Sequence, residues 1–85
     1  MSDAEIPADL IALKREFYAT ERKLAGLGDD SEAWNATHRR MGELAVQIHR
    51  HPALQALAGP DRLKLDSAAS RAAREQLAAQ DSAGG

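Results

Sequence analysis

The sequence predicts an all-α fold, with an antiparallel helical hairpin followed by a short helix and a weakly packed C-terminal helix, similar in outline to a three-helix bundle. Three observations predict it. Apolar residues recur at helical spacing in two long segments, a short glycine-containing turn joins these segments, and Gly and Pro residues divide the rest of the chain. We expect one helical domain over residues 1–80 and a disordered tail over residues 81–85.

The first helix is predicted from about Pro7 to about Gly26. Pro7 suits the first turn, where a missing N–H costs nothing, and Gly26 and Gly28 offer the left-handed conformation that ends a helix. The apolar residues alternate four and three positions apart, as in a helix that packs lengthwise on another. This stripe consists of Ile6, Leu10, Leu13, Phe17, Thr20, Leu24 and Leu27.

The second helix is predicted to begin after Asp29, Asp30 or Ser31, each of which is a competent N-cap, and to reach about Arg50. Pro52 pushes the residue before it out of the helical region. Two helices of similar length joined by a short turn should pack antiparallel. The face of the second helix that packs on the first is predicted to hold Trp34, Thr37, Met41, Leu44, Ala45 and Ile48.

The remainder of the chain predicts a short helix over Pro52–Ala58 and, after the Gly59-Pro60 break, a helix capped by Asp61 that ends near Gln80. The last helix has high helix propensity but a thin apolar face, so we expect it to dock weakly or fray. That face is predicted to hold Leu65, Ala69, Ala72, Ala73, Gln76 and, to one side, Leu77.

Composition excludes several classes of protein. There is no cysteine, so disulfides and thiolate chemistry are excluded, and the formal charge of −2 argues against general affinity for nucleic acid or anionic lipid. The first residues lack a secretory leader pattern, and no segment is apolar enough to span a bilayer, so we expect a cytoplasmic protein with no membrane contact. Arginine outnumbers lysine and alanine is abundant, which is typical of a GC-rich bacterial genome.

A second apolar seam on the first helix is a candidate partner-binding surface. Ile11, Tyr18 and Ala25 are seven positions apart and lie about 100° from the Phe17 stripe. Lys14, Arg15 and Arg22 surround them. One interpretation is that this side holds the last helix, because a small domain must cover its apolar surface. The other is an exposed contact patch, in which Tyr and Arg are favoured anchors.

The second helix carries a weaker candidate patch at Val46 and His49, which lie outside its predicted core face near Gly42. A glycine inside a helix costs about 1 kcal/mol relative to alanine, so one interpretation is that another segment packs closely against it. The last helix and a second copy of the chain are equally plausible neighbours, and chance retention of the glycine is nearly as plausible.

The three histidines do not predict a metal site. His38 and His49 are roughly 16 Å apart along a helix, and His49 and His51 would point to nearly opposite sides of a continuing helix. We interpret them as a solvated cluster that complements the negative end of the second helix. We expect no cofactor and no enzymatic activity, because the sequence has no phosphate loop, nucleophile motif or paired carboxylates.

The sequence therefore predicts a small protein–protein interaction or regulatory module that acts through apolar and basic helix faces. Its partner would be another protein or a second copy of the chain. The partner-binding residues predicted are Ile11, Arg15, Tyr18, Arg22, Val46 and His49. The alternative is a small nucleic-acid-associated regulator that uses Arg39, Arg40 and Arg50, and its binding would weaken steeply with salt.

Overall fold

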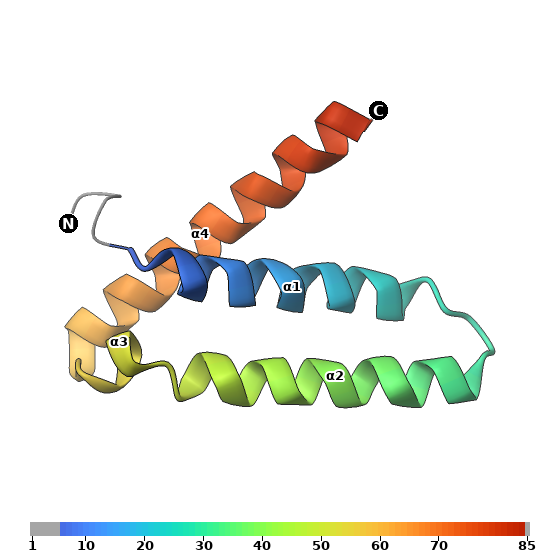
Figure 1. The fold of residues 1–85 in the computed structure, drawn as a ribbon, viewed down its shortest axis with the longest axis horizontal. Helices are drawn as coiled ribbons and strands as arrows, with labels where there is room; N and C mark the ends of the chain where they lie inside the picture. The colour runs from blue at the N-terminus through green and yellow to red at the C-terminus, as the bar shows by residue number, and fades with distance from the viewer. Residues whose placement is uncertain (1–5, 85) are drawn as a thin grey trace.

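A computed structural model of the chain describes residues 6–84, with side chains as far as Asp81. Four helices follow one another: α1 (Ala8–Ala25), α2 (Ser31–His49), α3 (Pro52–Gln55) and α4 (Gly59–Gly84). No strand occurs among the described residues, and the all-α prediction is confirmed (Figure 1).

The predicted hairpin is present. α1 and α2 lie side by side and run in opposite directions (Figure 1), and their bounds fall within one or two residues of those predicted. Gly28 in the connecting turn has a φ of 62°, which is the left-handed conformation that a side chain would strain. Of the three possible caps, Asp30 is the one used, because its carboxylate accepts the N–H of Ala33 at 3.0 Å.

The α1–α2 interface is closed mainly by Leu44 and Thr37 of α2, which are buried against the predicted stripe of α1. The prediction that Trp34 faces α1 is wrong. This residue remains 40% exposed and its ring stacks on that of His38, with the centroids 4.8 Å apart. Trp34 lies about 60° around the helix from Thr37, so it falls at the edge of the packed face.

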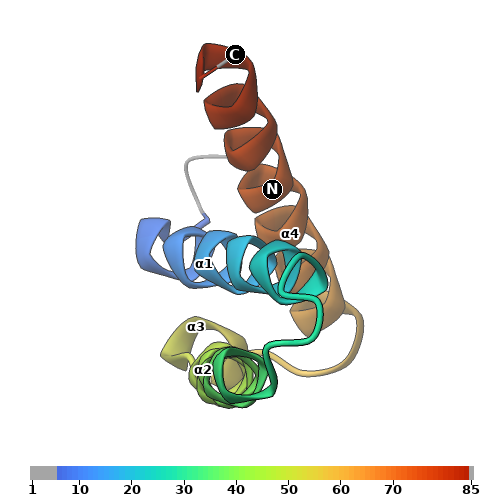
Figure 2. The same ribbon diagram turned by 90° about the vertical axis from the view of Figure 1, so that its right-hand side faces the viewer.

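α4 packs on a different side of α1 from α2. Figure 2, a view along the hairpin, shows α2 below α1 and α4 rising away from both. The central core lies where α1, α3 and α4 meet. It contains Leu10, Leu54, Leu65 and Ala69, and further along α4 Ala73 and Leu77 are also buried.

The last two helices differ in length from the prediction. α3 ends at Gln55, three residues before the predicted end at Ala58. α4 begins at Gly59, with Pro60 and Asp61 in its first turn, because proline is tolerated there. α4 also continues to Gly84, whereas the sequence predicted an end near Gln80 and a disordered tail. Alanine favours the helical state here, and Asp81 forms an ion pair with Arg22 of α1.

Candidate protein-interaction groove

α4 covers the side of α1 that holds the second apolar seam. Ile11 is half-buried against the central core, and the guanidinium of Arg74 lies 4.8 Å from the centroid of the Tyr18 ring. Arg15 donates to Gln76 Oε1 at 2.7 Å, and Arg22 pairs with Asp81. The last helix therefore packs on this side of α1, and Ile11, Arg15 and Arg22 contact residues of the same chain. That these residues bind a partner stays a prediction.

A buried lysine lies between the two stripes of α1 and was not predicted. Lys14 is only 6% exposed, and its Nζ lies 2.6 Å from Asp66 Oδ1 and 2.8 Å from Ser70 Oγ. Its methylene stem can lie along apolar neighbours while the ammonium meets these two acceptors. The contact ties α1 to the first half of α4.

α2 and α4 both pack on α1 but have little contact with each other. Near the C-terminal end of α2 and the start of α4, this arrangement leaves an open groove of about 510 Å³. Side chains from all four helices line it, and most of these side chains are apolar. The apolar lining consists of Phe17, Tyr18, Ala45, Ile48, Leu54 and Leu63.

The polar part of the lining consists of the buried Lys14 and of His49, Arg62 and Asp66. Arg62 Nη2 lies 3.2 Å from His49 Nδ1 and 3.4 Å from the backbone oxygen of His49. Gln55 Nε2 donates to that same oxygen at 2.7 Å. The last carbonyl of α2 thus accepts hydrogen bonds from both Gln55 and Arg62.

Two large apolar side chains stand out from the surface near the groove, and only one of them lines it. Leu63 is 66% exposed at the edge of the groove, whereas Val46 is 49% exposed and is not part of the lining. No atom lies within 4 Å of the Cβ that a side chain at Gly42 would have, so nothing approaches the chain closely there. Of the weaker predicted patch, His49 therefore lies at the groove and Val46 lies beside it.

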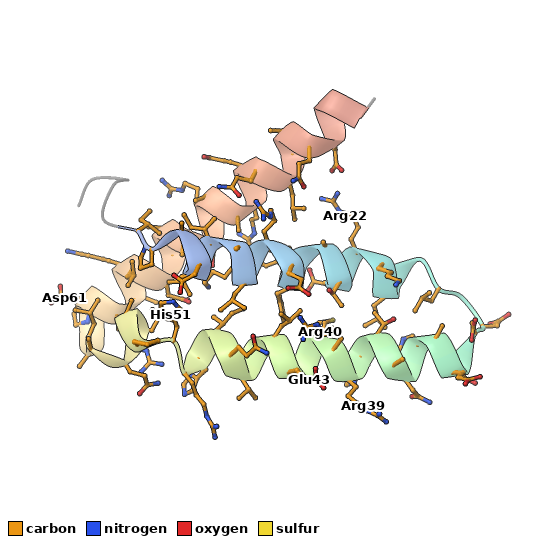
Figure 3. The ribbon with its side chains drawn as sticks, in the orientation of Figure 1. Arg22, Arg39, Arg40, Glu43, His51 and Asp61 are labelled. Carbon is orange, nitrogen blue, oxygen red and sulfur yellow. The ribbon has the colours of Figure 1, made fainter. Side chains whose placement is uncertain are left out.

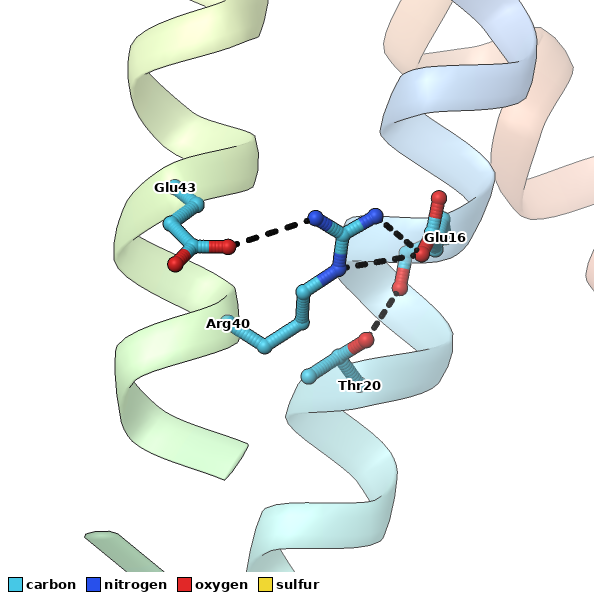
Figure 4. Close-up of polar contacts among 4 residues, drawn as sticks. All are labelled: Glu16, Thr20, Arg40 and Glu43. Carbon is cyan, nitrogen blue, oxygen red and sulfur yellow. Dashed lines mark hydrogen bonds and ion pairs between the residues drawn. The ribbon is translucent and has the colours of Figure 1, made fainter. Parts of the chain in front are cut away.

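The arginines of the alternative interpretation do not act together on one open surface. Arg40 lies between α1 and α2 (Figures 3 and 4), where its Nη2 is 2.7 Å from Glu16 Oε1 and its Nη1 is 3.4 Å from Glu43 Oε2. The hydrogen bond with Glu16 is the main reason why the pKa of Arg40 is raised. Arg39 points away from the hairpin (Figure 3), and Arg50 is exposed.

His51 is not part of a solvated cluster, so that interpretation is wrong for this residue. It lies between the start of α1 and α3 (Figure 3) and is only 9% exposed. Its Nδ1 accepts the N–H of Ala53 at 3.1 Å, and its Nε2 lies 2.9 Å from Asp9 Oδ2. Since Nδ1 accepts, Nε2 carries the proton that bonds Asp9. This bond lowers the pKa of Asp9.

Within residues 6–84, no set of three histidine or carboxylate side chains is placed to hold a metal ion. None of the helices in this part of the chain is both long and apolar enough to cross a membrane. Comparisons of the chain with protein-family models, curated proteins and solved structures find no match.

Proposed function

We propose that this chain is a small protein–protein interaction module, not an enzyme, and that its contact site is the groove between α2 and α4. The observation that carries the proposal is the apolar groove itself, with Leu63 two-thirds exposed at its edge. Exposed apolar concavities with polar rims are typical of binding sites. A cytoplasmic location is part of the proposal and rests on the absence of cysteine.

An amphipathic helix is the partner that suits this shape. α1 is packed by α2 on one side and by α4 on another, so a further helix could lie across Phe17 and Tyr18 between them. The walls would accept apolar side chains spaced three and four residues apart on that helix. Tyr18 and His49 are the predicted partner-binding residues that keep this role, because both line the groove.

The nucleic-acid alternative has less support. Arg40 is engaged by two carboxylates, and a phosphate would have to displace them. Arg39 and Arg50 lie about 20° apart on the polar side of α2, which also carries Glu32 and Glu43. Like and unlike charges interleaved on one face usually indicate a solvated surface.

A matched pair of substitutions tests the proposed site. The probe is a helical peptide of about 18 residues with leucine along one stripe and glutamine elsewhere, labelled for fluorescence anisotropy. Leu63→Asp should weaken its binding at least about tenfold, because a carboxylate at the groove edge opposes an apolar partner. Val46→Asp places the same charge on an exposed apolar site outside the groove and should leave binding unchanged.

Circular dichroism should show unchanged helicity for both variants. Light scattering across concentrations shows whether the chain also binds itself. A dimer that Leu63→Asp dissolves and Val46→Asp does not would keep the groove as the interaction site with a second copy as the partner. Two outcomes would refute the proposed site. One is the absence of both peptide binding and self-association, and the other is a loss of peptide binding in Val46→Asp but not in Leu63→Asp.

A further inference from the structure

The charge around the groove indicates which partner it accepts. Only one carboxylate is found among the described lining residues, that of Asp66, and Lys14 already binds it at 2.6 Å. Arg62, which also lines the groove, has no carboxylate within 4.0 Å among residues 6–81. The groove therefore combines a mostly apolar lining with one guanidinium, that of Arg62, that forms no ion pair within the described residues.

Arg62 contacts the end of α2 through one of its nitrogens. Its Nη2 lies 3.2 Å from the ring Nδ1 and 3.4 Å from the backbone oxygen of His49, while Nε and Nη1 make no hydrogen bond within the described part of the chain. A guanidinium has five N–H donors in a planar fork, so several remain to meet a carboxylate.

Two helix ends lie at the groove and contribute potentials of opposite sign: the start of α4 is positive, and the C-terminal end of α2, with Ile48 and His49 in the lining, is negative. α4 begins at Gly59, which lines the groove, and the first N–H groups of a helix form the positive end of its dipole. Asp61 in the same turn offsets part of this charge but does not line the groove.

We infer that the groove accepts an amphipathic helix of another protein that carries a carboxylate beside its apolar stripe, and that Arg62 binds this carboxylate. The inference rests on the proposed function and specifies the partner's chemistry. A second copy suits the groove less well, because a two-fold contact through it would bring Arg62 and His49 of one copy near the same residues of the other.

The test uses three peptides with the same leucine stripe, whose flanking residues are glutamate, glutamine or lysine. With the full chain, the glutamate peptide should bind about fivefold more tightly than the glutamine peptide, as for one partly exposed ion pair, and the lysine peptide should bind least tightly. Arg62→Gln should reduce the affinity for the glutamate peptide to that for the glutamine peptide, and leave the glutamine peptide unaffected. Lys64→Gln, two residues along α4 and outside the groove lining, is the matched control and should keep the preference.

The outcomes separate this inference from the proposed function. If the glutamine peptide binds and the glutamate peptide binds no more tightly, the inference is wrong and the groove remains an interaction site. The inference also fails if Arg62→Gln weakens all three peptides equally, if Lys64→Gln removes the preference, or if a single-stranded oligonucleotide competes for the groove. Failure of every peptide to bind would overturn the inference. It would also overturn the proposed function, unless the chain forms a dimer that Leu63→Asp dissolves, in which case a second copy occupies the groove.

Discussion

α1 is packed by two helices, and the two interfaces are built differently. Against α2 the buried side chains are Leu44 and Thr37, while Phe17 of α1 is half-buried and also lines the groove. On the α4 side the buried residues are Leu10 and Leu65 at one end, and further along α4 they are Ala69, Ala73 and Leu77. Polar contacts from Lys14, Arg15 and Arg22 supplement the alanines.

The difference between the two interfaces of α1 explains why a groove remains between α2 and α4. Alanines that are fully buried, such as Ala69 and Ala73, allow α4 to approach α1 closely. α4 crosses α1 at an angle and diverges from α2 (Figure 1), so the space between α2 and α4 stays open. The thin apolar face predicted for α4 is thus sufficient for docking, but it leaves a neighbouring surface uncovered.

The largest expected effect is at the junction of α1, α3 and α4. Leu10 is fully buried there, and Leu10→Ala should lower the free energy of unfolding by about 3 kcal/mol through lost burial and a cavity. Leu24→Ala, on the half-buried stripe toward α2, should cost about 1 kcal/mol. Urea unfolding of both variants measures the difference, and a larger loss at Leu24 would mean that the hairpin, not the junction, holds the core.

Removing Asp66 should lower the free energy of unfolding more than removing the charge of its partner Lys14. Asp66→Ala leaves the buried ammonium of Lys14 with Ser70 alone and should cost roughly 1–2 kcal/mol, less than for a fully buried pair because the Asp66 side chain is 44% exposed. Lys14→Met removes the charge but keeps the apolar stem, and Asp66 can then turn to water, so its cost should be below about 0.5 kcal/mol. Thermal unfolding compares the two variants, and equal losses would contradict this description of the α1–α4 contact.

A substitution on α2 should stabilise the chain. Gly42 lies inside the helix with open space beside it, so Gly42→Ala should raise the free energy of unfolding by about 0.5–1 kcal/mol. Gly28→Ala in the turn, where φ is 62°, should instead lower it by about 1 kcal/mol. Destabilisation by Gly42→Ala in denaturant titrations would indicate a close neighbour on α2, such as a second copy of the chain.

The smallest expected effect concerns Asp9, whose pKa is held below its ordinary value of 3.8 by the hydrogen bond from His51. The folded state therefore binds protons at Asp9 less readily than the unfolded state, and the stabilisation is complete above the ordinary pKa. It is lost as the pH falls through the lower, folded-state pKa. Melting temperatures of the native chain and of Asp9→Asn should differ above about pH 5 and converge in more acidic solution, and a gap that persists there would show that another group is responsible.

Much of the fold could be predicted from the sequence, because helix periodicity and capping residues are local signals. The stripe of α1, the Gly28 turn and the bounds of the hairpin follow from such signals. The sequence also left two options for the Tyr18 side, and packing of α4 was one of them. These features can be predicted without knowing the angles at which the helices cross.

The groove could not be predicted in the same way. It depends on the path of α4 across α1, which periodicity does not specify, so Leu63 and Arg62 had no visible role in the sequence. His51 was missed because its two partners, Asp9 and the N–H of Ala53, come together only after the chain turns at Pro52. A possible signal was the apolar Leu63, which lies off the predicted face of the last helix.

The most direct test of the central claim is amide and methyl chemical-shift mapping of the full chain with the glutamate-flanked peptide. The largest changes should fall on Ala45, Ile48 and Leu63, with a smaller response at Val46 and little change along the outer side of α2. That pattern would establish the groove between α2 and α4 as the site of contact. Changes centred instead on Arg39, Arg50 or the hairpin turn, or no saturable change at all, would contradict it.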